Sequence, residues 1–172
     1  MLDRILTELT IGGISRKADG KTKERAETLR SQLVGLSGNI LTFKTHGWVQ
    51  RVQLVRLPKW LNRFREGKKK LVDVVSWSIH SDVKVACSCP SMLYGGFAYI
   101  ASEGGFKVGR DQTRFPKVRN PGLNGSVCKH LVKVLEDLPG LVATVTRLVK
   151  RGMKQEEAEP APKAALRKGR GG

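Results

Sequence analysis

Cysteine and acidic residues are both scarce in this 172-residue chain. The first shortage argues against a disulfide-bonded protein, and the second leaves a large positive charge. Only three cysteines occur, an odd number that does not suit a disulfide-bonded secreted scaffold. Acidic residues number 15 against 32 lysines and arginines, which gives a formal net charge of +17. Such an excess favours a polyanionic partner, either nucleic acid or an acidic protein surface, and a merely solvated basic face is the alternative. No apolar run reaches the length of a membrane span, so we expect no membrane partner.

Recognisable catalytic motifs are missing as well. The sequence has no Gly-rich phosphate loop ending in Lys-Ser or Lys-Thr, no Gly-x-Ser-x-Gly elbow and no motif of paired carboxylates. We therefore expect a protein that is not an enzyme and has no small-molecule substrate. The first residues, Met1 to Arg4, lack the charged-then-apolar pattern of a secretion signal. We expect synthesis in a reducing cytoplasm, where thiols stay available for a metal.

The three cysteines and one of the histidines form two close pairs. Cys87-Ser88-Cys89 is followed by thirty-eight residues and then by Cys128-Lys129-His130. Three sulfurs and one imidazole are a complete tetrahedral ligand set for structural zinc. Cys87 and Cys89 point to the same side if the chain there is extended, and Cys128 and His130 open an apolar run with helical spacing. Buried thiols without a metal are the alternative. A catalytic zinc is disfavoured, because the protein would fill all four positions.

These residues resemble the signature of the SWIM-type zinc finger, which is Cys-x-Cys, a variable insert and Cys-x-His. The resemblance covers roughly residues 71–138. It implies that Zn²⁺ is bound by Cys87, Cys89, Cys128 and His130, with the first pair on a β-hairpin and the second pair at the start of a helix. Modules of this family are often proposed to bind nucleic acid.

A weaker resemblance is to small zinc-finger virion proteins of tailed bacteriophages. It rests on Cys87-Ser88-Cys89-Pro90, Tyr94, Asn120-Pro121 and Cys128-Lys129-His130-Leu131. It implies a structural component of a phage particle, made in the host cytoplasm, that contacts other protein subunits and also DNA or RNA. We favour this function. The alternative is a cytoplasmic SWIM-type protein that binds nucleic acid.

Hydrophobic periodicity predicts an α+β fold, with a small antiparallel sheet of about four strands, flanking helices and a zinc site that joins a β-hairpin to a helix N-terminus. We divide the chain into an N-terminal helical segment (1–38), a zinc-binding domain (39–152) with an insert (90–127), and a flexible tail (153–172). The predicted helices cover residues 1–9, 22–34, 58–66, 91–101, 128–138, with Ser126 as N-cap, and 141–151, capped by Gly152. The predicted strands cover residues 39–45, 48–57, 71–79 and 83–89, and the last two form the hairpin that carries the cysteines.

Cations gather in two places that can contact a polyanion. One is a run of three lysines beside an aromatic patch, and the other is the insert, a basic loop that zinc would hold at both ends. The candidate residues are Lys68, Lys69, Lys70, Lys107, Arg110, Arg114, Lys117 and Arg119.

Overall fold

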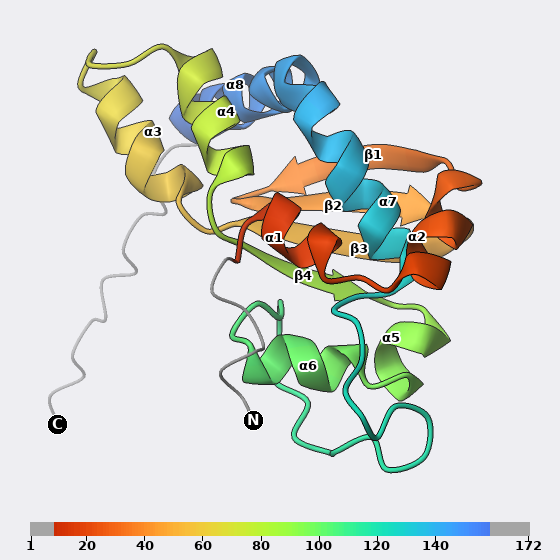
Figure 1. Cartoon of the computed structure of the whole chain (residues 1–172). Coiled ribbons are helices and arrows are strands. Elements are labelled where there is room, and N and C mark those ends of the chain that lie inside the picture. The colour runs from red at the N-terminus through yellow and green to blue at the C-terminus, as the bar shows by residue number, and fades with distance from the viewer. Residues whose placement is uncertain (1–8, 159–172) are drawn as a thin grey trace, which may run out of the picture.

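Four antiparallel strands form one sheet in the order β1-β2-β3-β4 in the computed structural model, which describes residues 9–158 (Figure 1). Their bounds are β1 Ser31–Ser37, β2 Ile40–Thr45, β3 Trp48–Leu54 and β4 Val83–Cys87. β2 and β3 are joined by the two residues His46 and Gly47, with φ of 51° and 81°. Positive φ at both positions defines the tight hairpin turn whose twist matches that of the strands. The predicted α+β fold with a four-stranded antiparallel sheet is confirmed.

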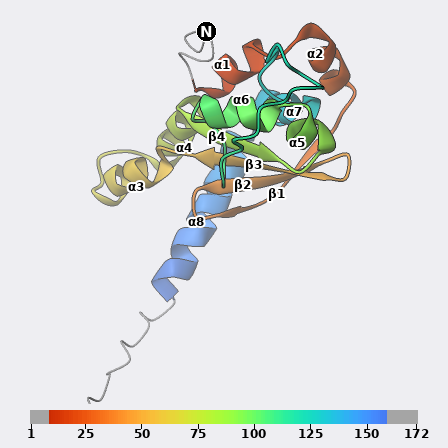
Figure 2. The ribbon, with the colours of Figure 1, turned by 90° about the horizontal axis from the view of Figure 1, so that it is seen from below.

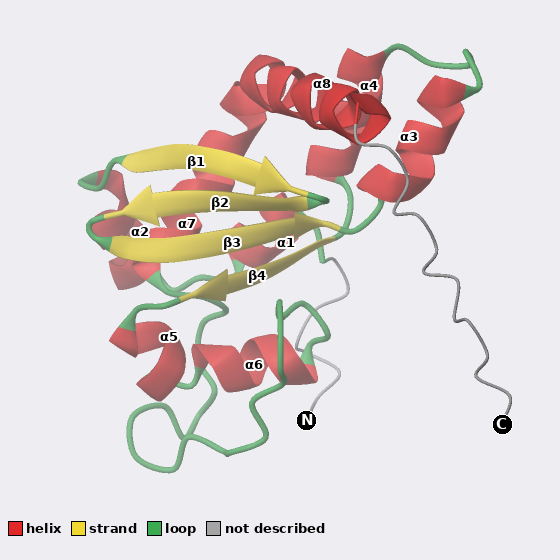
Figure 3. Ribbon diagram, turned by 180° about the vertical axis from the view of Figure 1, so that it is seen from behind, coloured by secondary structure: helices red, strands yellow, loops and turns green. Residues whose placement is uncertain are grey.

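Helices cover one face of the sheet, and Figure 3 shows the other face free of the described helices. α7 (Lys129–Asp137) packs on all four strands and on α1 (Ile11–Arg16) and α2 (Gly20–Glu27). Alternation along the strands turns large apolar side chains toward these helices. The completely buried ones include Leu41, Phe43, Val52, Leu54, Val83 and Val85. They meet the apolar side of α7, which is formed by Leu131, Val134 and Leu135.

A second group of helices lies at one end of the sheet, between β3 and β4 in the chain and after α7. α3 (Leu57–Arg65) packs on α4 (Leu71–His80), and α4 packs on α8 (Val142–Ala158). A 3-10 turn, Leu138–Leu141, joins α7 to α8. Figure 2 shows α8 projecting beyond the sheet on the side of β1. The predicted helix 141–151 therefore exists, but it is not capped by Gly152: it continues to Ala158, so residues 153–158 of the predicted tail are helical. Residues 159–172 lie outside the described part.

The predicted strand 71–79 is wrong, because these residues form α4. Val75, Trp77 and Ile79 alternate as in a strand, yet the buried side chains are Val74, Val75, Ser78 and Ile79, which follow the spacing of a helix. The Ser78 hydroxyl donates to the Val74 carbonyl at 2.7 Å, within the helix. The predicted hairpin of residues 71–79 and 83–89 is therefore wrong as well: β4 pairs with β3, and α3 and α4 separate the two strands in the chain.

The predicted helix 22–34 is correct only in its first part. α2 begins at Gly20 behind the N-cap Asp19, whose carboxylate accepts from the Thr22 backbone at 2.9 Å, and it ends at Glu27. The chain then becomes β1, because pairing with β2 buries Leu33 and Leu36 against the core. Residues 11–16 form α1, a helix that was not predicted. The predicted helix 1–9 lies outside the described residues except for Leu9.

The insert contains two short helices followed by a long loop. α5 (Pro90–Tyr94) and α6 (Phe97–Glu103) replace the single helix predicted over 91–101. They are separated at Gly96, whose φ of +81° no ordinary helix contains. The loop then runs along the outer edge of β4, where the Val85 N–H donates to the Phe106 carbonyl at 2.6 Å and the Val108 N–H donates to the Val85 carbonyl at 2.9 Å.

Candidate metal centre

Three elements bring the two sequence pairs together. Cys87 is the last residue of β4, Cys89 is the N-cap of α5, and Cys128 is the N-cap of α7 with His130 in its first turn. The chain stays extended between the first two, because the Ser88 N–H donates to the Val49 carbonyl at 2.9 Å and the Ser88 hydroxyl accepts from the Val49 N–H at 3.0 Å. The extended conformation turns both cysteine side chains to the same side.

The four potential donor atoms form one compact group. The three Sγ atoms and a ring nitrogen of His130 lie within 4.8 Å of one another. A tetrahedron with metal–sulfur bonds of about 2.3 Å has edges of about 3.8 Å, so the observed separations match a single shared ion after small side-chain shifts. The exposed fractions are 6% for Cys87, 1% for Cys89, 1% for Cys128 and 4% for His130. This cluster could hold a metal ion, as the sequence spacing predicts.

The three thiols contact one another, and each shifts the pKa of its neighbours. Hydrogen bonds from Cys128 and then Cys87 lower the pKa of Cys89, against the effect of burial. The contact with Cys128 favours the Cys87 thiolate, but the contact with Cys89 and burial outweigh it and raise the Cys87 pKa to about 11. Hydrogen bonds to Cys87 and Cys89, together with burial, raise the pKa of Cys128. A cation bound between the three sulfurs would favour the thiolate form of each of them.

Two polar side chains at the cluster fit a bound cation. Nδ1 of His130 is buried and has no hydrogen-bond partner within the described residues, a situation that costs about 1–3 kcal/mol unless a ligand satisfies the atom. Gln50 lies opposite Cys87 in the sheet, and its Nε2 donates to Cys87 Sγ at 3.4 Å and to the Trp48 carbonyl at 2.9 Å. Such a donor orients a ligand sulfur and stabilises its negative charge.

Sequence reasoning missed Gln50 and misplaced Ser126. Gln50 shares a strand face with Val52 and Leu54, and a polar residue in an otherwise apolar row is the signal that could have revealed it. Ser126 is not the N-cap of α7, because that position belongs to Cys128. The Ser126 hydroxyl instead donates to the Ile14 carbonyl at 2.7 Å and fastens the end of the insert to α1.

The structure separates the candidate polyanion-binding residues. The three lysines at 68–70 lie between α3 and α4, at the opposite end of the molecule from the insert (Figure 1). Lys68 pairs with Glu66 at 2.8 Å, and the Lys69 ammonium lies 5.0 Å from the Trp77 ring centre. Lys107 donates to the carbonyls of its own loop. Of the eight candidates, the structure brings three around one cavity: Arg114, Lys117 and Arg119.

A scan against protein-family models found no match, and searches of curated proteins and of solved structures found none either. The resemblances to SWIM-type fingers and to phage virion proteins therefore rest on the motif residues alone. No helix within residues 9–158 combines the length and apolar character needed to cross a membrane. The site and the fold define a small α+β chain with a buried cluster of three cysteines and one histidine that could hold a metal.

Proposed function

We propose that the chain is a non-enzymatic, zinc-stabilised structural protein. The observation that carries the proposal is the convergence of four buried donor atoms within 4.8 Å. Three thiolates and an imidazole suit zinc, which takes sulfur and nitrogen ligands in tetrahedral geometry. Four protein ligands leave no position for water or substrate, which favours a structural over a catalytic ion.

The zinc would join parts of the chain that are distant in sequence. It would tie the end of β4 and the start of α5 to the start of α7, across the insert. The insert contains few elements that could fix it alone, since α5 and α6 have five and seven residues and helices this short are marginal by themselves. The ion thus supports the insert as a presented surface rather than performing chemistry.

We infer that this surface contacts other subunits of a larger assembly, namely a tailed-bacteriophage particle, which would place the protein in the virion. The motif resemblance supports this, and so does the exposure of large apolar side chains. Val118 is 90% exposed and Tyr94 66%, and apolar exposure of this kind is typical of interaction surfaces when it is clustered. Tyr94 and Val118 belong to the insert. The expected measurement is co-purification with a particle from the native source, and a free monomer there would contradict this function.

A cytoplasmic protein that binds nucleic acid is the second candidate. The net charge of +17 favours it, because a strongly cationic chain concentrates near polyanions. The two candidates differ in what the isolated protein does. The second requires tight binding to nucleic acid that weakens steeply with salt, whereas the first requires stable incorporation into a particle.

Metal content tests the zinc proposal directly. We expect one zinc per chain by mass spectrometry of the purified protein, as one cluster is present within the described residues. Replacing zinc with Co²⁺ should give the visible absorption of a tetrahedral thiolate site. Cys128→Ser should abolish that spectrum, whereas Ser126→Ala, two residues away, should leave it intact. A chain that is metal-free after expression in zinc-supplemented medium and binds no Co²⁺ would refute the proposal.

A further inference from the structure

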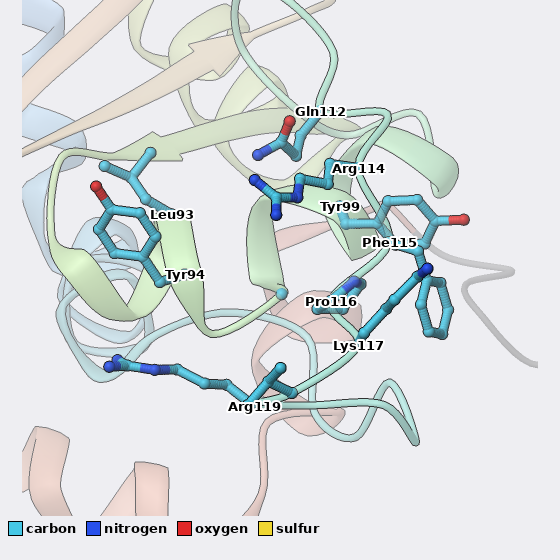
Figure 4. A pocket seen from close by; sticks show the side chains of 11 residues that line it. Leu93, Tyr94, Tyr99, Gln112, Arg114, Phe115, Pro116, Lys117 and Arg119 are labelled. Atoms are coloured by element: carbon cyan, nitrogen blue, oxygen red, sulfur yellow. The ribbon is translucent and has the colours of Figure 1, made fainter.

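The insert carries a cavity of about 780 Å³ between α5, α6 and the loop that follows them (Figure 4). Two kinds of side chain dominate its wall. The aromatic ones are Tyr94, Tyr99 and Phe115, and the cationic ones are Arg114, Lys117 and Arg119. No acidic side chain of residues 9–158 lines it. Figure 4 shows Leu93 and Tyr94 on one side and the Arg114 guanidinium directed into the space facing them from the other.

The wall is held in place by specific contacts. The Tyr99 and Phe115 rings pack edge to face with centres 5.5 Å apart. The Gln112 N–H donates to the Ser102 hydroxyl at 2.7 Å and anchors the loop to α6. A Cβ on Gly96 would lie 2.7 Å from Cγ of Pro116, so the loop packs directly on the turn between α5 and α6. The cavity is therefore a formed feature and not a gap between independent segments.

The cations of the wall are available to a ligand. Arg114, Lys117 and Arg119 are exposed, and none of them enters an ion pair with any described acidic residue. The apolar groups beside them are also open to solvent, since Tyr94 is 66% and Phe115 41% exposed. A ligand that complements this wall carries both negative charge and flat apolar surfaces.

We propose that this cavity binds single-stranded nucleic acid, with bases stacked on its aromatic rings and phosphates contacted by Arg114, Lys117 and Arg119. Single strands are held by this combination of stacking platforms and cationic grooves. A duplex is the wrong shape, because its bases are already stacked and the cavity falls within the small-ligand range of roughly 300–1,000 Å³. The proposal rests on the proposed function in that zinc, held by residues at both ends of the insert, would keep the wall assembled.

The experiment measures binding of the full-length zinc protein to a short fluorescent single-stranded oligonucleotide as salt is varied. Tyr94→Ala should weaken binding about 5- to 150-fold, the range of one stacked base, whereas Tyr94→Phe, which keeps the ring, should bind like the native chain. The double variant Arg114→Ala, Arg119→Ala should reduce the slope of log affinity against log salt by about 0.7 for each phosphate that the protein no longer neutralises. The charge-matched control Lys68→Ala, Lys70→Ala, at the other end of the molecule, should change that slope far less.

Three results would overturn the cavity proposal. The first is undiminished binding by Tyr94→Ala. The second is an equal decrease of slope in the Lys68→Ala, Lys70→Ala control, which would mean diffuse attraction to the whole cationic surface. The third is displacement of the oligonucleotide by polyglutamate at the same charge concentration, which would identify an acidic peptide as the ligand.

Metal content and melting temperature, measured on every variant, distinguish a failure of the cavity proposal from a failure of the zinc proposal. If the native protein is metal-free and the Tyr94→Ala substitution weakens oligonucleotide binding, the zinc proposal is refuted and the cavity proposal is supported. A zinc-loaded protein that is indifferent to Tyr94→Ala would support the zinc and refute the cavity. Tyr94 is largely exposed, so its truncation should not unfold the chain, and Arg114→Glu is a second variant that should abolish binding.

Discussion

Removal of the proposed zinc should destabilise this protein by a large part of its total folding free energy. The ion would cross-link Cys89 and Cys128 and close a loop with thirty-eight residues between them. By the chain-entropy relation used for disulfides, a cross-link of this loop length restricts the unfolded chain by about 4 kcal/mol. Metal–ligand bonding adds to this, and structural zinc sites reach about 10 kcal/mol or more at neutral pH. Whole domains are stable by only roughly 5–15 kcal/mol.

The chain-entropy contribution alone sets the smallest decrease in melting temperature that we expect on zinc removal. A domain of about 150–250 residues loses roughly 2–4 °C in melting temperature per kcal/mol, so a loss of about 4 kcal/mol lowers the melting temperature by about 8–16 °C. Thermal unfolding followed by circular dichroism, with and without a strong zinc chelator, measures this directly. Hydrogen exchange should show where the loss falls. α5, α6 and the loop up to residue 127 should lose protection first, whereas the β1–β2–β3 meander should keep it.

A matched pair of histidine variants supplies the control. His130→Asn removes a donor from the cluster, whereas His46→Asn changes an exposed turn residue with φ of 51°, a conformation that asparagine tolerates. Only the first should reproduce the effect of the chelator. A melting temperature that moves by less than a few degrees on chelation would show that the four side chains form a packed thiol cluster without a structural ion.

Further predictions concern pH, the neighbour of the cluster and the turn in the insert. Because the pKa of Cys87 rises from 9.0 to about 11 on folding, the metal-free protein should lose stability as pH rises through that window. The zinc form should instead lose stability as pH falls, because acid protonates the ligands. Urea titrations of both forms at several pH values measure the two opposite pH dependences. Gln50→Leu should weaken zinc affinity about 10- to 100-fold, as is typical when a hydrogen bond to a ligand is removed, in competition with a chromogenic chelator. Gly96→Ala should cost about 1–3 kcal/mol from its positive φ and more from the contact with Pro116, so it should destabilise the protein more than Gly67→Ala, where φ is +72° but a Cβ meets nothing within 4 Å.

The outcome for the metal cluster shows how much local spacing can decide. Cys-x-Cys in extended chain places two sulfurs on one side of the backbone, and Cys-x-His places its two donors where α7 begins. The α+β class followed from the same local periodicities, and β2, β3 and α7 lie where they were expected. The two pairs then had only to meet, and the structure brings their donor atoms within 4.8 Å.

The amino-acid sequence by itself therefore determined the four donor residues, the excess of positive charge and most helix and strand types. Tertiary packing decided the rest. The apolar residues of 71–79 fit both the two-residue period of a strand and the 3.6-residue period of a helix, and only burial against α3 and α8 selects the helix. Residues 31–37 become a strand because their backbone pairs with the edge of β2. The positions of loops depend on contacts between distant segments, which no local pattern encodes. Such contacts place Arg114, Lys117 and Arg119 around one cavity and leave Lys68 to Lys70 far from it.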